Sequence, residues 1–62
     1  RRELFRRNEA IRNWLASKAA RFALDAQQVD PTSSEYARLI KLSENYADLV
    51  SEYTKKMERY AV

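Results

Sequence analysis

The fold is decided by one short segment at the middle of the chain, Asp30-Pro31-Thr32-Ser33-Ser34. It contains the only proline among the 62 residues, and the chain has no glycine that would mark a second turn. Thr32 and Glu35 have the spacing of a capping box, which predicts that Thr32 caps the downstream helix. A cap at Asp30, with Pro31 as the first helical residue, is the alternative. In both cases a turn at about residues 29–32 separates two helices.

The stretch before the turn predicts a helix over about residues 2–28, because it lacks glycine and proline and its apolar residues follow helical spacing. These residues form one stripe, with steps of three or four, if Asn8 is included: Leu4, Asn8, Ile11, Leu15, Ala19, Phe22, Ala26 and Val29. Asn8 has two interpretations, a buried polar residue that fixes helix register or an exposed residue near a frayed end.

The stretch after the turn predicts a second helix over about residues 33–60. Steps of three and four alternate along it in a heptad pattern: Tyr36, Leu39, Ser43, Tyr46, Val50, Tyr53, Met57 and Tyr60. Ser43 is the one residue out of character, and we interpret it as a small residue that the seam tolerates. Further apolar residues widen this face to nearly half of the helix circumference, more than a single neighbouring helix covers.

These two helices predict an all-α fold, an antiparallel helical hairpin that forms a single domain over residues 1–62. A chain of this size buries only about 60% of its unfolded surface, and this one has no disulfide to compensate. We therefore expect the hairpin to associate into a four-helix bundle or a larger helical oligomer. The chain begins with Arg1 rather than Met, so we expect it to be cut from a longer protein.

The composition argues against an enzyme. The chain has no His, the commonest general base, no Cys for a thiolate site and no Gly for a phosphate-binding loop. Glu44, Asp48 and Glu52 line one helix face, where a solvated acidic stripe is favoured over a divalent-cation site. The sequence therefore predicts no catalytic residue, no metal, no cofactor and no small-molecule substrate.

The leading functional hypothesis is a non-enzymatic module for oligomerisation or protein–protein interaction, with a second copy or another helical protein as the partner. The contact surface is expected to follow the helical seam: Leu15, Phe22, Leu39, Tyr46, Val50, Tyr53, Met57 and Tyr60. The tyrosines are interpreted as amphipathic seam residues, with a base-stacking platform as the alternative.

The alternative hypothesis is a small basic hairpin that binds or packages nucleic acid. Residues 1–29 carry a net charge of +4 and residues 30–62 a net charge of −1, which together give +3. Phosphate contacts, with one stacking aromatic ring, would come from Arg1, Arg2, Arg6, Arg7, Arg12, Trp14, Lys18 and Arg21. Two i,i+4 ion pairs are also expected within this helix, Glu3–Arg7 and Arg21–Asp25.

Two further expectations concern the surroundings of the chain. Helix 2–28 has Arg, Trp and Phe in an amphipathic setting, but its apolar stripe is needed for the hairpin core. Burial in lipid would compete with folding, so we expect no attachment to a membrane. We expect a cytoplasmic location. Leu24 projects away from the stripe, and together with Trp14 it would mark a second contact surface.

Overall fold

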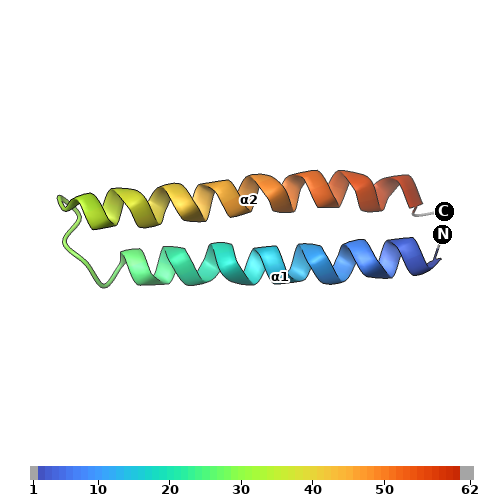
Figure 1. The fold of residues 1–62 in the computed structure, drawn as a ribbon, viewed down its shortest axis with the longest axis horizontal. Coiled ribbons are helices and arrows are strands. Elements are labelled where there is room, and N and C mark those ends of the chain that lie inside the picture. The colour runs from blue at the N-terminus through green and yellow to red at the C-terminus, as the bar shows by residue number, and fades with distance from the viewer. Residues whose placement is uncertain (1, 61–62) are drawn as a thin grey trace.

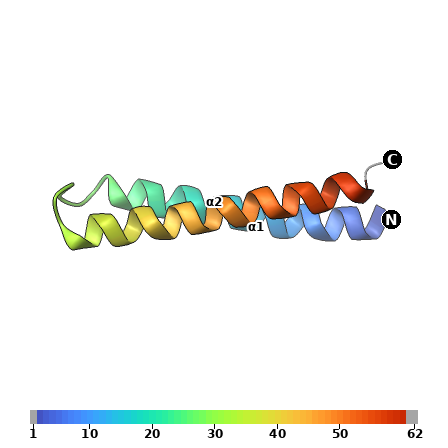
Figure 2. The same cartoon turned by 90° about the horizontal axis from the view of Figure 1, so that it is seen from above.

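The computed structural model describes residues 2–60 of the chain, in which two long helices pack side by side. Helix α1 spans Arg2–Ala26 and helix α2 spans Ser34–Tyr60. They run antiparallel along their whole length, so that the start of α1 lies beside the end of α2 (Figures 1 and 2). The predicted all-α hairpin is confirmed, and residues 2–60 contain no strand.

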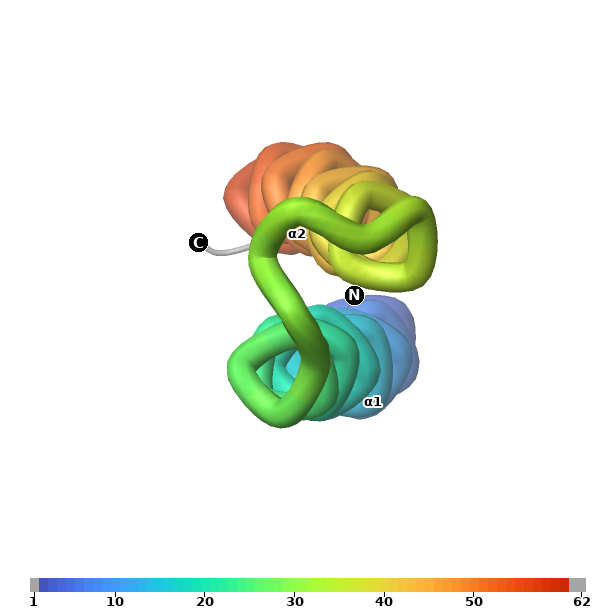
Figure 3. The backbone as a smooth tube through the Cα atoms, turned by 90° about the vertical axis from the view of Figure 1, so that its left-hand side faces the viewer, coloured from blue at the N-terminus to red at the C-terminus, as the bar shows by residue number. Residues whose placement is uncertain are grey.

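The hairpin is a single layer, 46 Å long and only 13 × 11 Å across between Cα atoms. Seen along its axis, each helix has the other as its one neighbour, and the connection crosses between them at the end (Figure 3). Each helix is therefore covered on one side and open on the others.

Helix α1 ends two residues earlier than the sequence predicts. After Ala26 the chain tightens into i→i−3 hydrogen bonds, from Gln27 N to Leu24 O (3.1 Å) and from Gln28 N to Asp25 O (3.0 Å). Such bonds satisfy carbonyls that the last turn of a helix leaves free. Gln27 and Gln28 are not helix breakers, so the local sequence does not set the C-terminal end of α1. That end is set by the point at which the chain must leave α1 to reach α2.

The turn itself is organised by Asp30. Its Oδ1 accepts hydrogen bonds from the Thr32 amide (2.8 Å) and the Thr32 hydroxyl (2.7 Å), and its carbonyl accepts one from Ser33 N (3.0 Å). This is an Asx-type turn. The backbone hydrogen bond from Thr32 is the larger cause, and the side-chain bond the smaller, of a lowered pKa of the Asp30 carboxyl.

Ser33 caps α2, so both predicted caps are wrong. Its Oγ accepts a hydrogen bond from Tyr36 N (3.1 Å), and its carbonyl accepts one from Ala37 N (3.4 Å). The Thr32 hydroxyl donates to Asp30 Oδ1 and accepts no helix amide, whereas the Ser33 hydroxyl donates to Asp30 O (2.6 Å) and accepts from Tyr36 N. The side chain of Asp30 closes the turn instead of capping a helix, and α2 begins at Ser34.

The core of the hairpin is a thin seam between the two helices. Its buried side chains are Leu15 and Ala26 from α1 and Leu39 and Met57 from α2. One hydrogen bond joins the helices within residues 2–60 by way of a side chain, from Ser43 Oγ to Ala19 O (2.9 Å). The interpretation of Ser43 as merely a tolerated small residue is therefore wrong. Its hydroxyl joins α2 to the backbone of α1 in the observed register.

Candidate interaction surface

An aromatic cluster lies on one side of the hairpin and bridges the two helices. Tyr46 of α2 stacks on Phe22 of α1, with ring centroids 5.6 Å apart and an interplanar angle of 19°. Trp14 meets the same tyrosine edge-on, at 6.3 Å and 76°. Because the three rings are on the same side of the seam, they identify which flanks of α1 and α2 form one continuous face.

Helical spacing extends this face along the hairpin. Leu4 precedes Phe22 by eighteen residues, about five helical turns, and therefore lies in line with it on α1. On α2, Leu49 and Tyr53 follow Tyr46 at i+3 and i+7, which places them on the same side. We call the resulting surface the aromatic face, and it comprises Leu4, Trp14, Phe22, Tyr46, Leu49 and Tyr53.

Large apolar side chains on the aromatic face are incompletely covered. Trp14 is 56% exposed, Leu4 42% and Leu49 39%. These are three of the four large hydrophobic side chains exposed within residues 2–60, and the fourth is Leu24. A concentration of exposed apolar groups on one face is typical of an interaction surface rather than of scattered surface residues.

Cationic side chains border the aromatic face. The Lys18 ammonium lies 5.4 Å from the centre of the Trp14 ring, and the Lys56 ammonium lies 4.5 Å from the centre of the Tyr53 ring. Both distances are within the range of a cation–π interaction. The apolar surface thus has a positively charged rim on both helices.

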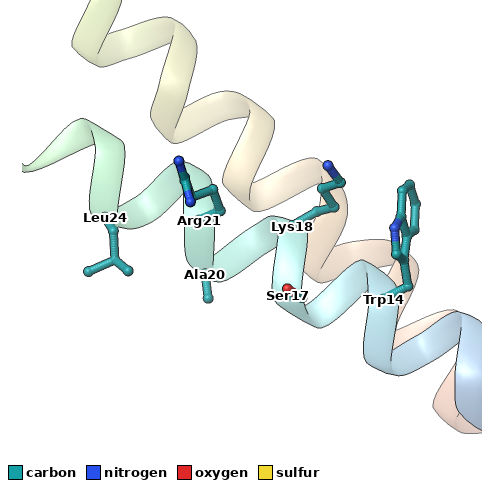
Figure 4. A pocket seen from close by; sticks show the side chains of 6 residues that line it. All are labelled: Trp14, Ser17, Lys18, Ala20, Arg21 and Leu24. Atoms are coloured by element: carbon teal, nitrogen blue, oxygen red, sulfur yellow. The ribbon is translucent and has the colours of Figure 1, made fainter.

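Leu24 belongs to a different surface, the outside of α1. It is 58% exposed and, with Trp14, Ser17, Lys18, Ala20 and Arg21, lines an open groove of about 620 Å³ (Figure 4). In the close-up, Ser17, Ala20 and Leu24 form one row along the helix, and Trp14, Lys18 and Arg21 form the other. The expected second contact surface of Trp14 and Leu24 thus corresponds to one groove, with Trp14 shared between this groove and the aromatic face.

The residues predicted for a protein interface divide into two groups. Leu15, Leu39 and Met57 are buried between α1 and α2 of the same chain, because the partner helix of the hairpin covers the centre of the seam. The others are half-buried along its edges: Phe22, Tyr46, Val50, Tyr53 and Tyr60. Only this second group retains surface for a partner to contact.

The residues predicted for nucleic-acid contact do not share one face. Trp14, Lys18 and Arg21 lie together beside the groove, and Arg7 is seven residues before Trp14 on the same side. Arg12 is on the opposite flank, and its guanidinium donates a hydrogen bond to Asn13 Oδ1 (3.0 Å).

Arg2 and Arg6 are exposed in the first turns of α1, and Arg1 lies outside the described residues. Of the two expected ion pairs, Arg21–Asp25 forms at 3.5 Å, whereas within residues 2–60 Glu3 and Arg7 do not pair. Exposed pairs of this type contribute little to stability.

Sequence reasoning missed a cationic cluster at the open end of the hairpin. The antiparallel arrangement brings Lys55, Lys56 and Arg59 of α2 to the same end as Arg2, Arg6 and Arg7 of α1 (Figure 1). Residues 2–7 and 55–60 together carry six cations and two anions, a net charge of +4. The cluster follows from the predicted antiparallel hairpin, which places the start of the first helix beside the end of the second. It is not visible as one basic stretch, because its two segments lie almost fifty residues apart in the sequence.

The acidic stripe of α2 stays exposed, with Glu44, Asp48 and Glu52 at its surface. Across residues 2–60, no three or more ligating side chains gather in a way that could hold a metal ion. Neither α1 nor α2 carries an apolar stretch long enough to cross a bilayer, as far as the described part of the chain is concerned.

Comparison of the chain with protein-family models, with curated proteins and with solved structures finds no match.

Proposed function

We propose that this hairpin is a non-enzymatic association module that forms a helical bundle through its aromatic face. The observation that carries the proposal is that the exposed large apolar side chains Leu4, Trp14 and Leu49 share one side of the hairpin with the Trp14–Tyr46–Phe22 cluster. Aromatic residues at the centre with a polar rim around them are typical of protein interfaces. Burying these groups against another helical surface would complete a core that one hairpin leaves open.

The surface area of the hairpin supports the same proposal. It exposes 4976 Å², whereas a compact monomer of 7.3 kDa exposes about 4,200 Å². The excess, about 800 Å², accompanies the elongated shape of the hairpin, 46 × 13 × 11 Å between Cα atoms, which leaves most sides of each helix uncovered. A second copy supplies a surface of the same size and chemistry.

The test compares two exposed leucines on different surfaces. Leu49→Gln changes the aromatic face, and Leu24→Gln makes the same chemical change on the outside of α1, where the leucine is even more exposed. We expect the wild-type chain and Leu24→Gln to have at least twice the monomer mass by light scattering. Leu49→Gln should raise the dissociation constant at least tenfold, about 1.4 kcal/mol.

Circular dichroism of each variant verifies that it remains helical. A monomeric wild-type chain at high concentration would contradict self-association. Equal weakening by Leu49→Gln and Leu24→Gln would contradict the choice of the aromatic face.

A second candidate function is binding of nucleic acid, and the cationic open end favours it. Arg2, Arg6 and Arg7 with Lys55, Lys56 and Arg59 supply six positive groups at one end of a narrow rod. If all six contacted phosphates of duplex DNA, the logarithm of the affinity would fall with the logarithm of salt concentration with a slope of about −5.

The experiment is fluorescence anisotropy with a labelled duplex at several salt concentrations. The double variant Arg6→Gln/Lys55→Gln removes two charges from the open end, and Arg38→Gln/Lys41→Gln removes two elsewhere. Both pairs are exposed. The first variant should reduce the salt slope by about 2, while the second leaves it nearly unchanged. Equal effects of the two variants would remove this candidate.

A further inference from the structure

Charge is segregated along the axis of the hairpin. The open end, residues 2–7 and 55–60, carries +4. The turn end, residues 22–37, contains Asp25, Asp30 and Glu35 and no Lys or Arg, which gives −3. The described residues in between add +1. Arg21 lies next to the turn-end segment and pairs with Asp25 at 3.5 Å, and including it leaves the turn end at −2. Because the two ends are separated by most of the 46 Å length, the hairpin has one positive and one negative end (Figure 1).

The aromatic face is centred between these two ends. Trp14 is the middle residue of α1 (Arg2–Ala26), and Tyr46 is one residue from the middle of α2 (Ser34–Tyr60). Leu4 extends the face toward the open end, and Phe22 extends it toward the turn. A two-fold axis through the Trp14–Tyr46 contact would therefore place the face of one copy over the same face of a second copy, as an isologous dimer requires.

We infer that two copies pair through their aromatic faces in antiparallel orientation, with the cationic open end of each beside the acidic turn end of the other. This inference rests on the proposed self-association and adds the identity of the partner and its direction. In a parallel pair the two +4 ends would lie together and the two −3 ends would lie together. In an antiparallel pair each +4 end meets a −3 end.

The energy difference between the two orientations comes from charges on ends that lie beside each other in the dimer, because salt screens the more distant charges. Helices that pack face to face have axes about 10 Å apart, comparable to the screening length at physiological salt, about 8 Å. Charges on adjoining ends therefore interact, whereas charges separated by the full 46 Å do not. The antiparallel dimer avoids repulsion at both ends and gains attraction there.

The orientation is measurable by electron spin resonance, because the chain has no cysteine and a single introduced one can be labelled uniquely. Pro31→Cys places a nitroxide at the turn, and Glu44→Cys places one near the middle of α2; both positions are exposed. Light scattering gives the mass of each labelled protein. Double electron–electron resonance then gives the distance between the two labels of a dimer.

The inference predicts a distance of about 45 Å between turn labels, close to the length of the hairpin. A parallel dimer would bring the same labels within about 20 Å, one interhelical spacing plus the label arms. The Glu44→Cys control gives an intermediate distance in both orientations, so it reports that a dimer exists. A short distance, or a mixture of short and long distances, from the turn labels with a normal control would overturn the antiparallel arrangement but leave self-association standing. A monomeric mass with no coupling in the control would overturn both.

Discussion

Replacing Leu39 and Leu49 by alanine, one at a time, distinguishes the core of the hairpin from the proposed association surface. Both leucines are on α2, but Leu39 is 7% exposed and Leu49 is 39% exposed. Truncation of a core leucine costs about 2–5 kcal/mol. The seam is thin and can partly collapse, so we expect the lower part of that range for Leu39→Ala, about 2–3 kcal/mol.

A loss of this size is large for so small a protein. A folding free energy of about 0.05–0.15 kcal/mol per residue gives the chain about 3–9 kcal/mol in total. Each kcal/mol corresponds to about 4–8 °C in the melting temperature of a domain of this size, so Leu39→Ala should melt about 10–20 °C lower. Leu49→Ala loses a partly solvated side chain, and its cost within one hairpin should be no more than about 1 kcal/mol.

The assay is thermal unfolding followed by circular dichroism at a low and a high protein concentration. Wild-type and Leu39→Ala proteins should melt higher at the high concentration, because association stabilises the folded state by mass action. Leu49→Ala should lose this concentration dependence, and the control Leu24→Ala should retain it. The reasoning would be refuted if Leu49→Ala destabilised the dilute protein as much as Leu39→Ala. It would also be refuted if Leu39→Ala had almost no effect.

Three further predictions concern the turn and the register of the helices. Ser33→Ala removes the cap of α2 and should lower the free energy of unfolding by about 1 kcal/mol in urea titrations, whereas capping by Thr32 would make the substitution nearly neutral. The lowered pKa of Asp30 stabilises the fold above its ordinary value of 3.8, and this contribution should be lost as the pH falls through the lower folded value. Asp30→Asn should remove that part of the acid sensitivity in pH titrations of helicity. Ser43→Ala breaks the bond to Ala19 at a cost of about 0.5–1.5 kcal/mol but gains helix propensity of roughly half a kcal/mol, so a melting temperature within a few degrees of wild type is expected.

The sequence was sufficient for the two helices and their antiparallel packing because both signals are strong and local. Apolar residues recur at helical spacing on both sides of a single proline-containing turn. Leu15, Leu39 and Met57, chosen from that spacing alone, are buried in the seam. The ends of both helices were predicted within two residues.

The cap and the interhelical hydrogen bond were not predictable in the same way. Residues 32–34 are three consecutive hydroxyl side chains, each able to cap a helix, and the choice among them depends on the path of the turn, in which Asp30 bonds the hydroxyls of both Thr32 and Ser33. Ser43 finds its acceptor on a residue twenty-four positions away. The helical wheel of α2 shows that Ser43 faces the seam, but it does not show which carbonyl of α1 is opposite, because that depends on the final register.

The thin seam would couple the folding of this chain to the association proposed above. Leu15, Ala26, Leu39 and Met57 are the apolar residues buried within residues 2–60, while Trp14, Leu4 and Leu49 remain open to water. An interface that covers the aromatic face would therefore supply apolar burial that the monomer lacks. Each kcal/mol gained in this way would be a large addition to a folding free energy of only about 3–9 kcal/mol. Helix stability and bundle formation should consequently rise together with protein concentration rather than in separate steps. A hairpin with the same melting temperature over a hundredfold range of concentration would instead show that the seam alone stabilises the fold, without association.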